Sequence, residues 1–449
     1  YKGGIKPSTI TLADLACLLP SLKTFNSTLS VHADFNGQGE TLNIPKLLIS
    51  STTGDIGLNM TGWVKDIRQK EPAWLVDIQH LDLSGKTINF ISENLKGEQA
   101  KVPDIINRMG SIHLKGATSG VGLSNITTNN QLNTDAGNIS ISLKMDSQRK
   151  FKGDVKTDGI NLKRLLDNAH FGQLATQIAL SGQLPENGNV QVDADGILNT
   201  FEYQGYQYKN IEVNGHYSKN DIHGTLNIDD PNVTLNVEGQ VLKEGRTNNV
   251  QLTAQVGNLS PKLINLTDKW DEARFSGVLN ANFMASSVND IVGTIEVSDF
   301  FMTSSSEYYE LDKVSIESNF TEEIHHITLD SDFGNIEITG DFDYQTLPQS
   351  FTNFIAAKLP TLPGIPKLNP NTKNNFVIAA TINKSDWLRH LLQVPVYLEQ
   401  PLHLQGMVND PMNSIELECE IPRIVYKESG YANGLINITS PGDSLQYNL

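Results

Sequence analysis

Apolar and polar residues alternate with a period of two along most of this chain. Ile415, Leu417, Cys419 and Ile421, for example, alternate with the glutamates between them. Because successive side chains of a strand point to opposite faces, such a segment forms a strand with one apolar face and one solvent-exposed face. One-sided strands are typical of antiparallel meanders and not of buried parallel sheets. The same pattern recurs over 139–145, 190–194, 233–237 and 376–382.

Turn-forming residues separate these runs at short intervals, as at Asn214-Gly215, Asp230-Pro231-Asn232 and Asn433-Gly434. Such pairs are strong local signals for hairpins and loops. Between 187 and 257 they predict a meander, with strands over about 190–195, 201–206, 209–215, 222–228, 233–241 and 250–256.

Short helical patterns interrupt the strands. Apolar residues at helical spacing predict helices over 10–19, which Pro20 would end, over 102–109, over 162–166, over 259–273 and over 385–392. Ser260-Pro261 and Ser385-Asp386 provide N-terminal caps for the last two. A strand that ends in glycine is expected after each of the helices beyond the first, at Gly116, Gly182, Gly277 and Gly406.

The short helices between the strands divide the chain into regions of a degenerate structural repeat. Region 1–157 is a β-groove repeat with short helices near 10–19 and 102–109. Region 158–258 is a helix followed by a meander. Region 259–383 repeats that order and contains a Pro-rich loop over 359–370, and region 384–449 is a truncated repeat of the same kind.

Charge and cysteine content narrow the possible functions. The 449 residues include 34 basic and 51 acidic ones, a net charge of −17, which repels nucleic-acid phosphates and anionic lipid surfaces. We therefore expect no nucleic-acid partner.

The only cysteines, Cys17 and Cys419, lie near opposite ends of the sequence, which excludes a disulfide scaffold and a cysteine zinc site. No apolar run approaches the ~20 residues of a membrane-spanning helix. Since the chain begins at Tyr1, we interpret it as part of a longer or processed protein.

No segment carries a convincing catalytic or cofactor motif. Gly85-Lys86-Thr87 resembles the end of a phosphate loop, but His80 stands where that loop requires glycine. Asp193-Ala194-Asp195-Gly196 has too few acidic ligands for a calcium loop. The adjacent His325 and His326 would face opposite sides of a strand and cannot easily share a metal. The sequence therefore predicts a protein that is not an enzyme, with no cofactor and no metal.

The apolar strand faces must nevertheless be covered by something, and few helices are available. One solution packs sheet on sheet, as in β-sandwiches, or closes a barrel. The other is a long curled sheet whose apolar face lines a groove. Soluble proteins avoid an exposed apolar patch of that size unless it binds a partner. Lipid tails suit it, because an acyl chain of sixteen carbons left in water costs ~13 kcal/mol at ~0.8 kcal/mol per CH₂. About 30 strands spaced ~4.8 Å apart would form a track on the order of 150 Å long.

Three neighbouring segments of the chain stand out, namely Phe201–Gly215, Gly224–Asn232 and Leu235–Gly239. A second, looser set consists of Gly293–Phe300, Asp332-Phe333 and Ile336–Gly340. The expected order of a helix followed by a strand that ends in glycine recurs at 158–182, 259–277 and 384–406. These segments and this order resemble the TamB/AsmA-like family of large envelope proteins of Gram-negative bacteria, especially those of the Bacteroidota. The motifs are structural, with no catalytic signature, and the similarity covers most of the chain.

The resemblance implies an all-β fold with a few short helices, an elongated repeating β-groove (β-taco) built from antiparallel strand meanders. It also implies a periplasmic location and an inner-membrane anchor in a segment absent from this sequence. The family is linked to phospholipid transport to the outer membrane. It is also linked to the assembly or secretion of outer-membrane proteins with a barrel partner, through the translocation and assembly module.

Three hypotheses for the function follow. The first is a non-enzymatic, bridge-like carrier of phospholipids between the inner and outer membranes, with acyl chains as partners. The second is a periplasmic scaffold or chaperone for outer-membrane proteins, which would bind a barrel protein. The third is a secreted β-sandwich adhesin, and closed sandwich cores would support it. The groove candidates of the first hypothesis are Ile139, Ile141, Leu143, Val190, Val192, Val233, Leu235, Val237, Ile336, Ile338, Ile415 and Leu417.

Overall fold

A computed structural model describes residues 1–11, 13, 28–94, 104–123, 125–185, 188–305, 307–358, 372–426, 429–440 and 446–448. The chain forms two compact units. Unit 1 comprises Tyr1–Pro231 with Ile264–Leu266, and unit 2 comprises Asn232–Leu263 with Thr267–Leu449. The loop expected over 359–370 and Cys17 lie outside the described residues.

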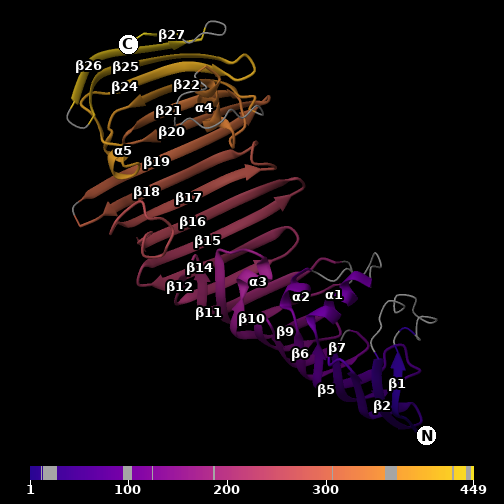
Figure 1. Ribbon diagram of the computed structural model, residues 1–449. Helices are drawn as coiled ribbons and strands as arrows, with labels where there is room; N and C mark the ends of the chain where they lie inside the picture. Colours follow the sequence, from indigo (N-terminus) through magenta and orange to yellow (C-terminus); the bar gives the residue numbers. More distant parts are fainter. Residues whose placement is uncertain are drawn as a thin grey trace. The chain divides into compact units, whose positions relative to one another are not determined.

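Unit 1 is an antiparallel sheet whose strands pair with their neighbours in chain order, with short helices beside it (Figure 1). Its first strands are β1 (Lys2–Thr11), β2 (Thr28–Gln38), β3 (Thr41–Ser51), β4 (Ile56–Lys65), β5 (Ala73–Leu83), β6 (Ile112–Val121) and β7 (Asn125–Thr134). They continue with β8 (Gly137–Met145), β9 (Lys150–Asn161), β10 (Phe171–Gln183), β11 (Gln191–Tyr203), β12 (Tyr206–Tyr208), β13 (Ile211–Tyr217) and β14 (Asp221–Asp230). The helices are α1 (Gly85–Asn94), α2 (Asp104–Met109) and α3 (Leu162–Leu166).

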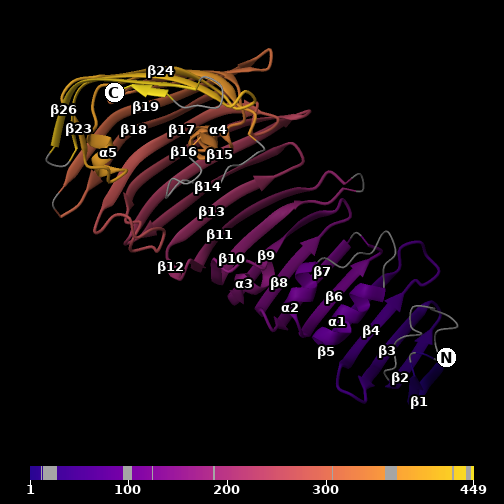
Figure 2. The ribbon, with the colours of Figure 1, turned by 45° about the horizontal axis from the view of Figure 1, so that its top comes forward.

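Unit 2 repeats this organisation (Figure 2). Its first strands are β15 (Val233–Glu244), β16 (Thr247–Leu259), β17 (Arg274–Ala285), β18 (Val292–Thr303), β19 (Tyr308–Thr321), β20 (Ile324–Ser331) and β21 (Gly334–Asp341). The rest are β22 (Asn375–Ile382), β23 (Val396–Leu398), β24 (Leu402–Asn409), β25 (Ser414–Tyr426), β26 (Ser429–Thr439) and β27 (Gln446–Asn448). Its helices are α4 (Leu347–Lys358) and α5 (Asp386–His390).

The expected fold class is confirmed. The described strands are antiparallel, helices are few and short, and the sheet stays open, as a repeating β-groove requires.

Local sequence explains the tight turns that connect these strands. Between β8 and β9, the Asp146 carboxylate accepts hydrogen bonds from the amides of Gln148, at 2.8 Å, and Lys150, at 2.9 Å. Arg149 takes a left-handed conformation with φ of 58° and completes the reversal.

Three helix predictions are confirmed. A helix forms at α3, where the side chain of Asn161 caps the amide of Arg164 at 3.0 Å and Asp167 ends the helix in a left-handed conformation. Helix α2 lies within the expected range 102–109, and α5 within 385–392.

The helix predicted over 259–273 is wrong. Leu259 is the last residue of β16, and the residues after it form successive turns. Asn265 and Glu272 have φ of 59° and 53°, and left-handed residues cannot continue a right-handed helix. Trp270 instead packs edge-to-face on Phe275 of the following strand, with ring centroids 5.1 Å apart. Tertiary packing of the tryptophan has overridden the helical spacing.

The helix predicted over 10–19 is wrong at its start, because Ile10 and Thr11 belong to β1 and pair with β2. Its remaining residues, apart from Ala13, lie outside the described residues. The strands predicted over 190–195 and 201–206 are not separate, because β11 runs from Gln191 to Tyr203. Gln204 and Gly205 then form a turn, and Tyr206 begins β12. The glycines expected at strand ends lie inside β6, β10, β17 and β24.

Candidate functional site: the apolar face of the sheet

The apolar faces of the strands in unit 1 are in register with one another. Ile141 of β8 lies opposite Val155 of β9, and Val155 lies opposite Ile178 of β10. Directly opposed residues of a sheet share a face and lie ~5 Å apart. Followed from partner to partner, one row crosses from β1 to β14 through Ile5, Ala33, Leu47, Met60, Ile78, Gly116, Asn130, Ile141, Val155, Ile178, Gly196, Val213 and Leu226.

Other groove candidates of unit 1 lie on the same face. Leu143 belongs to the neighbouring row, opposite Gly153, and Val192 lies two residues before Ala194 of that row. The side chains of Ile141, Leu143 and Val192 are half-buried, whereas the serines and aspartates between them are exposed. Val190 precedes β11 and is outside the strand. The face is therefore apolar and only partly covered, while the opposite face is polar.

A polar patch on β6 and β7 interrupts this face. Asn130, in the row just described, donates hydrogen bonds from Nδ2 to Thr128 Oγ1, at 2.5 Å, and Thr118 Oγ1, at 3.1 Å. Its Oδ1 is buried without a hydrogen-bond partner among the described residues. The alternation of apolar and polar residues did not predict this patch. The available signal is that β7 carries polar residues on both faces, at positions 127 to 131.

Helices cover one end of the face. Ala136, Ile160 and Leu165 form a buried cluster, and Ile139 and Met109 pack against it. Arg108 of α2 donates a hydrogen bond to the backbone oxygen of Leu165 in α3, at 3.1 Å. The groove candidate Ile139 thus lies under α2 and α3, at the edge of the uncovered face.

Unit 2 has its own apolar row, free of the polar interruption seen in unit 1. It begins at Gly239 and Leu252 and crosses the sheet to β26. Most of its members are half-buried. The row runs through Gly239, Leu252, Ala281, Ile295, Ile316, Leu329, Ile336, Ala380, Leu404, Cys419 and Ile436.

Three groove candidates lie on β15, at the start of this unit. Val237 lies opposite Ala254, and Leu235 lies opposite Val256. Both are half-buried and alternate with exposed polar residues. Val233, at the first position of the strand, is buried with 4% of its surface exposed.

The remaining four candidates lie against a packed core. Phe342, Phe376, Ile378, Val408 and Ile415 form a buried cluster. The partly buried residues packed against it include Ile336, Ile338, Leu417 and Leu347 of α4. Within the described residues, the segment after β21 therefore packs over the apolar face of β21 to β25 and leaves the face over β15 to β19 open.

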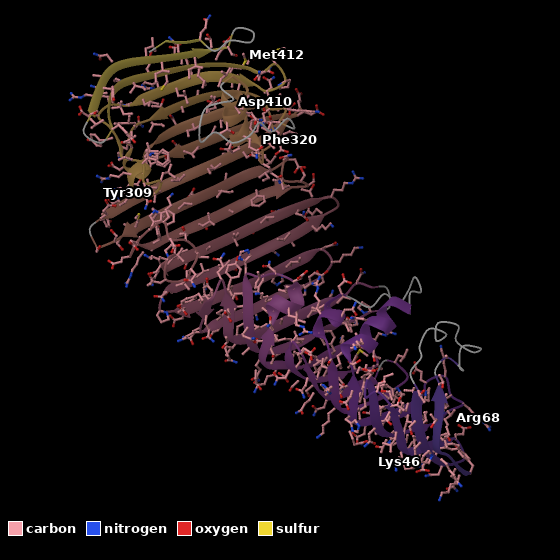
Figure 3. The ribbon with its side chains drawn as sticks, in the orientation of Figure 1. Lys46, Arg68, Tyr309, Phe320, Asp410 and Met412 are labelled. Atoms are coloured by element: carbon pink, nitrogen blue, oxygen red, sulfur yellow. The ribbon has the colours of Figure 1, made fainter. Side chains whose placement is uncertain are left out.

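A buried polar network holds this cover in place. Ser350 of α4 is fully buried and donates a hydrogen bond to Asp410 Oδ2 at 2.7 Å. Asn374 is 1% exposed, donates to Ser350 Oγ at 2.7 Å and accepts from the amide of Asp343 at 2.8 Å. Each buried polar group has a partner, so the network stabilises one position of α4. In Figure 3, Tyr309 and Phe320 lie toward opposite ends of β19.

Among the described residues, no group of three or more metal-ligating side chains occurs, and no helix is long and apolar enough to cross a membrane. His325 is buried and its neighbour His326 is half-exposed, as their strand positions predict. Burial raises the pKa of the Cys419 thiol, which keeps this member of the apolar row uncharged.

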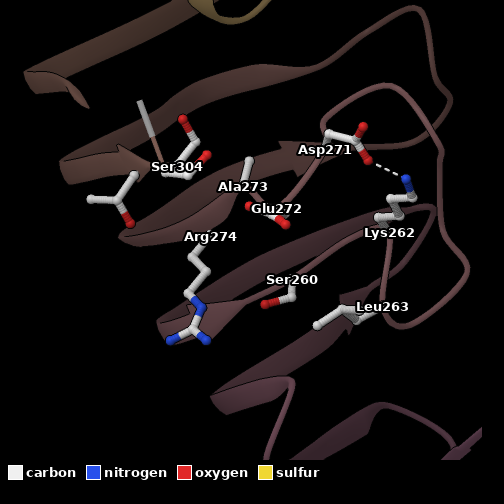
Figure 4. A pocket seen from close by; sticks show the side chains of 10 residues that line it. Ser260, Lys262, Leu263, Asp271, Glu272, Ala273, Arg274 and Ser304 are labelled. Atoms are coloured by element: carbon white, nitrogen blue, oxygen red, sulfur yellow. Dashed lines mark hydrogen bonds and ion pairs between the residues drawn. The ribbon is translucent and has the colours of Figure 1, made fainter. Parts of the chain in front are cut away.

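A polar pocket of about 670 Å³ lies beside the start of β17 (Figure 4). Lys262 donates a hydrogen bond to Asp271 within the lining, and this bond raises the pKa of Lys262. Glu272 and Arg274 also line it. Two acidic side chains, Asp271 and Glu272, and two basic ones, Lys262 and Arg274, balance in charge there.

Comparison with family models, with curated proteins and with solved structures found no match to the chain. The geometry of the apolar face is therefore the basis for assigning a function.

Proposed function

We propose that this chain is a non-enzymatic carrier of phospholipid acyl chains and a TamB/AsmA-like protein of the periplasm. The observation that carries the proposal is the in-register apolar row of each unit, half-buried on one face of an open sheet. An acyl chain laid on such a row is removed from water at each strand, at ~25 cal/mol per Å² of apolar surface. The polar opposite face keeps the carrier soluble.

The lengths of the rows suit a track better than a pocket. At ~4.8 Å per strand, the row from β1 to β14 extends over roughly 60 Å, several times the depth of a small-molecule site. Along a track of this kind, no single position binds a lipid much more tightly than its neighbours. A lipid can therefore move from strand to strand. Transport between the inner and outer membranes is the role that such movement would serve.

Site-specific photo-crosslinking tests the proposal. A photoreactive residue at Ile141 or Leu252 faces the apolar side, and one at the adjacent Ser142 or Gln251 faces the polar side. We expect phospholipid adducts, detected by mass spectrometry, at the first pair and not at the second. The absence of lipid from both apolar positions would refute the carrier function.

A scaffold for outer-membrane proteins is the second candidate, and an edge of the sheet favours it. Strand β1 pairs with β2 along one side, and an open strand edge can accept a strand from a client. Crosslinks from β1 to barrel proteins, without lipid at Ile141, would support this function.

The β-sandwich adhesin requires two sheets packed face to face, whereas the described strands of each unit pair in an open sheet.

A further inference from the structure

An apolar pocket adjoins the open part of the face in unit 2. Its volume is about 490 Å³, within the range of ~300–1,000 Å³ typical of ligand sites. It lies where β16 ends and β17 begins. The lining consists of Val256, Leu259, Pro261, Lys269, Trp270, Phe275, Ser276, Gly277, Val278, Leu279, Val297, Phe300, Leu391 and Leu392.

The floor of the pocket belongs to the apolar face itself. Leu279 of β17 lies opposite Val297 of β18, each two residues from the row that contains Ala281 and Ile295. Val256 lies two residues beyond Ala254 on β16. A ligand in the pocket can therefore extend directly onto the apolar row.

The roof is made of two segments far apart in sequence. The indole Nε1 of Trp270 donates a hydrogen bond of 3.2 Å to the backbone oxygen of His390, the last residue of α5. The side-chain amide of Gln393 donates to the backbone oxygen of Lys269. Trp270 and Leu391 also pack on the cluster around Met302 and Tyr309. These contacts fix the roof above the floor, so the pocket is preformed.

A single charged side chain lines this otherwise apolar site. Lys269 is exposed, and its Nζ lies 4.9 Å from the centroid of the Trp270 ring. Within the described part of the chain, no carboxylate forms an ion pair with it. An apolar cavity lined by one exposed cation, with no carboxylate partner among the described residues, is complementary to an acyl chain that carries a phosphate.

We propose that this pocket binds one acyl chain of a phospholipid, with the lipid phosphate on Lys269 and the tail running onto the row toward Leu252 and Ile295. This proposal rests on the carrier function. It identifies the site in unit 2 that binds both the acyl tail and the phosphate of a lipid. The cover packed over β21 to β25 gives such a site a role, because a lipid that moves along the row toward this part of the sheet meets α4.

Crosslinking distinguishes this site from the track as a whole. We expect a photoreactive residue at Leu279 to capture phosphatidylcholine from vesicles, and one at the adjacent, exposed Asn280 to capture none. Lipid at Leu252 or Ile141 without lipid at Leu279 would overturn the pocket and leave the carrier function standing. Lipid at none of the three positions would overturn both.

Lys269→Gln tests the role of the lysine. We expect binding of phosphatidylcholine to weaken about fivefold, the effect of one lysine beside a lipid phosphate, and binding of diacylglycerol with the same tails to remain unchanged. Lys269→Arg should retain the affinity, and Lys243→Gln, at the exposed end of β15, is the matched control. Equal weakening for both lipids, or none, would show that Lys269 does not hold the phosphate.

Discussion

Trp270 and His390 are joined by a hydrogen bond of 3.2 Å although 120 residues separate them in the sequence. The strands from β17 to β22 lie between them in chain order, so the bond connects the segment before β17 to α5. It brings an aromatic ring and a helix end together over the apolar face. This contact holds the segment before β17 and the end of α5 together, and the two segments form the roof of the pocket.

Loss of this bond should loosen the roof without unfolding the unit. In Trp270→Phe the ring still packs on Phe275, but the donor to His390 is lost, at a net cost of about 1 kcal/mol. We expect faster hydrogen exchange at the amide of Leu391, which bonds to Trp387 in the wild type. Unchanged exchange there would mean that packing alone holds the roof.

A charge on the open face of unit 1 should block lipid and spare the fold. Ile141→Asp would bury a carboxylate under the acyl chain, which costs several kcal/mol, so bound lipid should fall more than about tenfold. Ser142→Asp, on the polar face of the same strand, is the control and should keep the lipid. Mass spectrometry of lipid extracted from both variants measures the effect, and circular dichroism verifies that the fold is retained.

The covered face of unit 2 should respond differently. Phe376 is 1% exposed within the cluster beneath α4, so Phe376→Ala should destabilise the unit by about 3–5 kcal/mol. Glu416→Ala, on an exposed position of β25, should change stability by less than about 0.5 kcal/mol. Urea denaturation measures both. Similar stability of the two variants would indicate that α4 does not cover the sheet in solution.

Asp343 should make stability depend on acid pH. A hydrogen bond from Asn289, at 2.8 Å, and bonds from the amides of Gln345 and Thr346 hold the pKa of Asp343 below its ordinary 3.8. Its stabilising contribution is therefore present above the unfolded pKa and is lost as the pH falls through the folded pKa. Below about pH 4, the wild type should lose more stability than Asp343→Asn, whose side chain does not titrate. Parallel pH profiles of the melting temperature would contradict this.

The period-two pattern was sufficient to predict the fold class and which face of each strand is apolar. Ile139, Ile141 and Leu143, for example, all face the same side of β8, as their spacing requires. Helices were harder to predict, and α1 was missed. Its Thr87, Ile88 and Ile91 are β-branched and favour strands, and the segment is held helical by the cap at Ser84 and by burial of Ile88.

The candidate site was only partly predictable for a related reason. Ile336 and Ile338 alternate as Ile141 and Leu143 do, yet they lie against the core beneath α4. Alternation identifies an apolar face but does not say what covers it, because the covering segment can come from any distance along the chain.

The sequence by itself determined that the chain forms one-sided antiparallel strands, since side-chain orientation in a strand follows from local backbone geometry. Only the tertiary structure decided which rows of those strands stay open, where Asn130 interrupts them, and where α4 and Trp270 close over them. The physical reason is that register and covering depend on contacts between residues far apart in the chain, and the free energy of such contacts is a property of the assembled sheet.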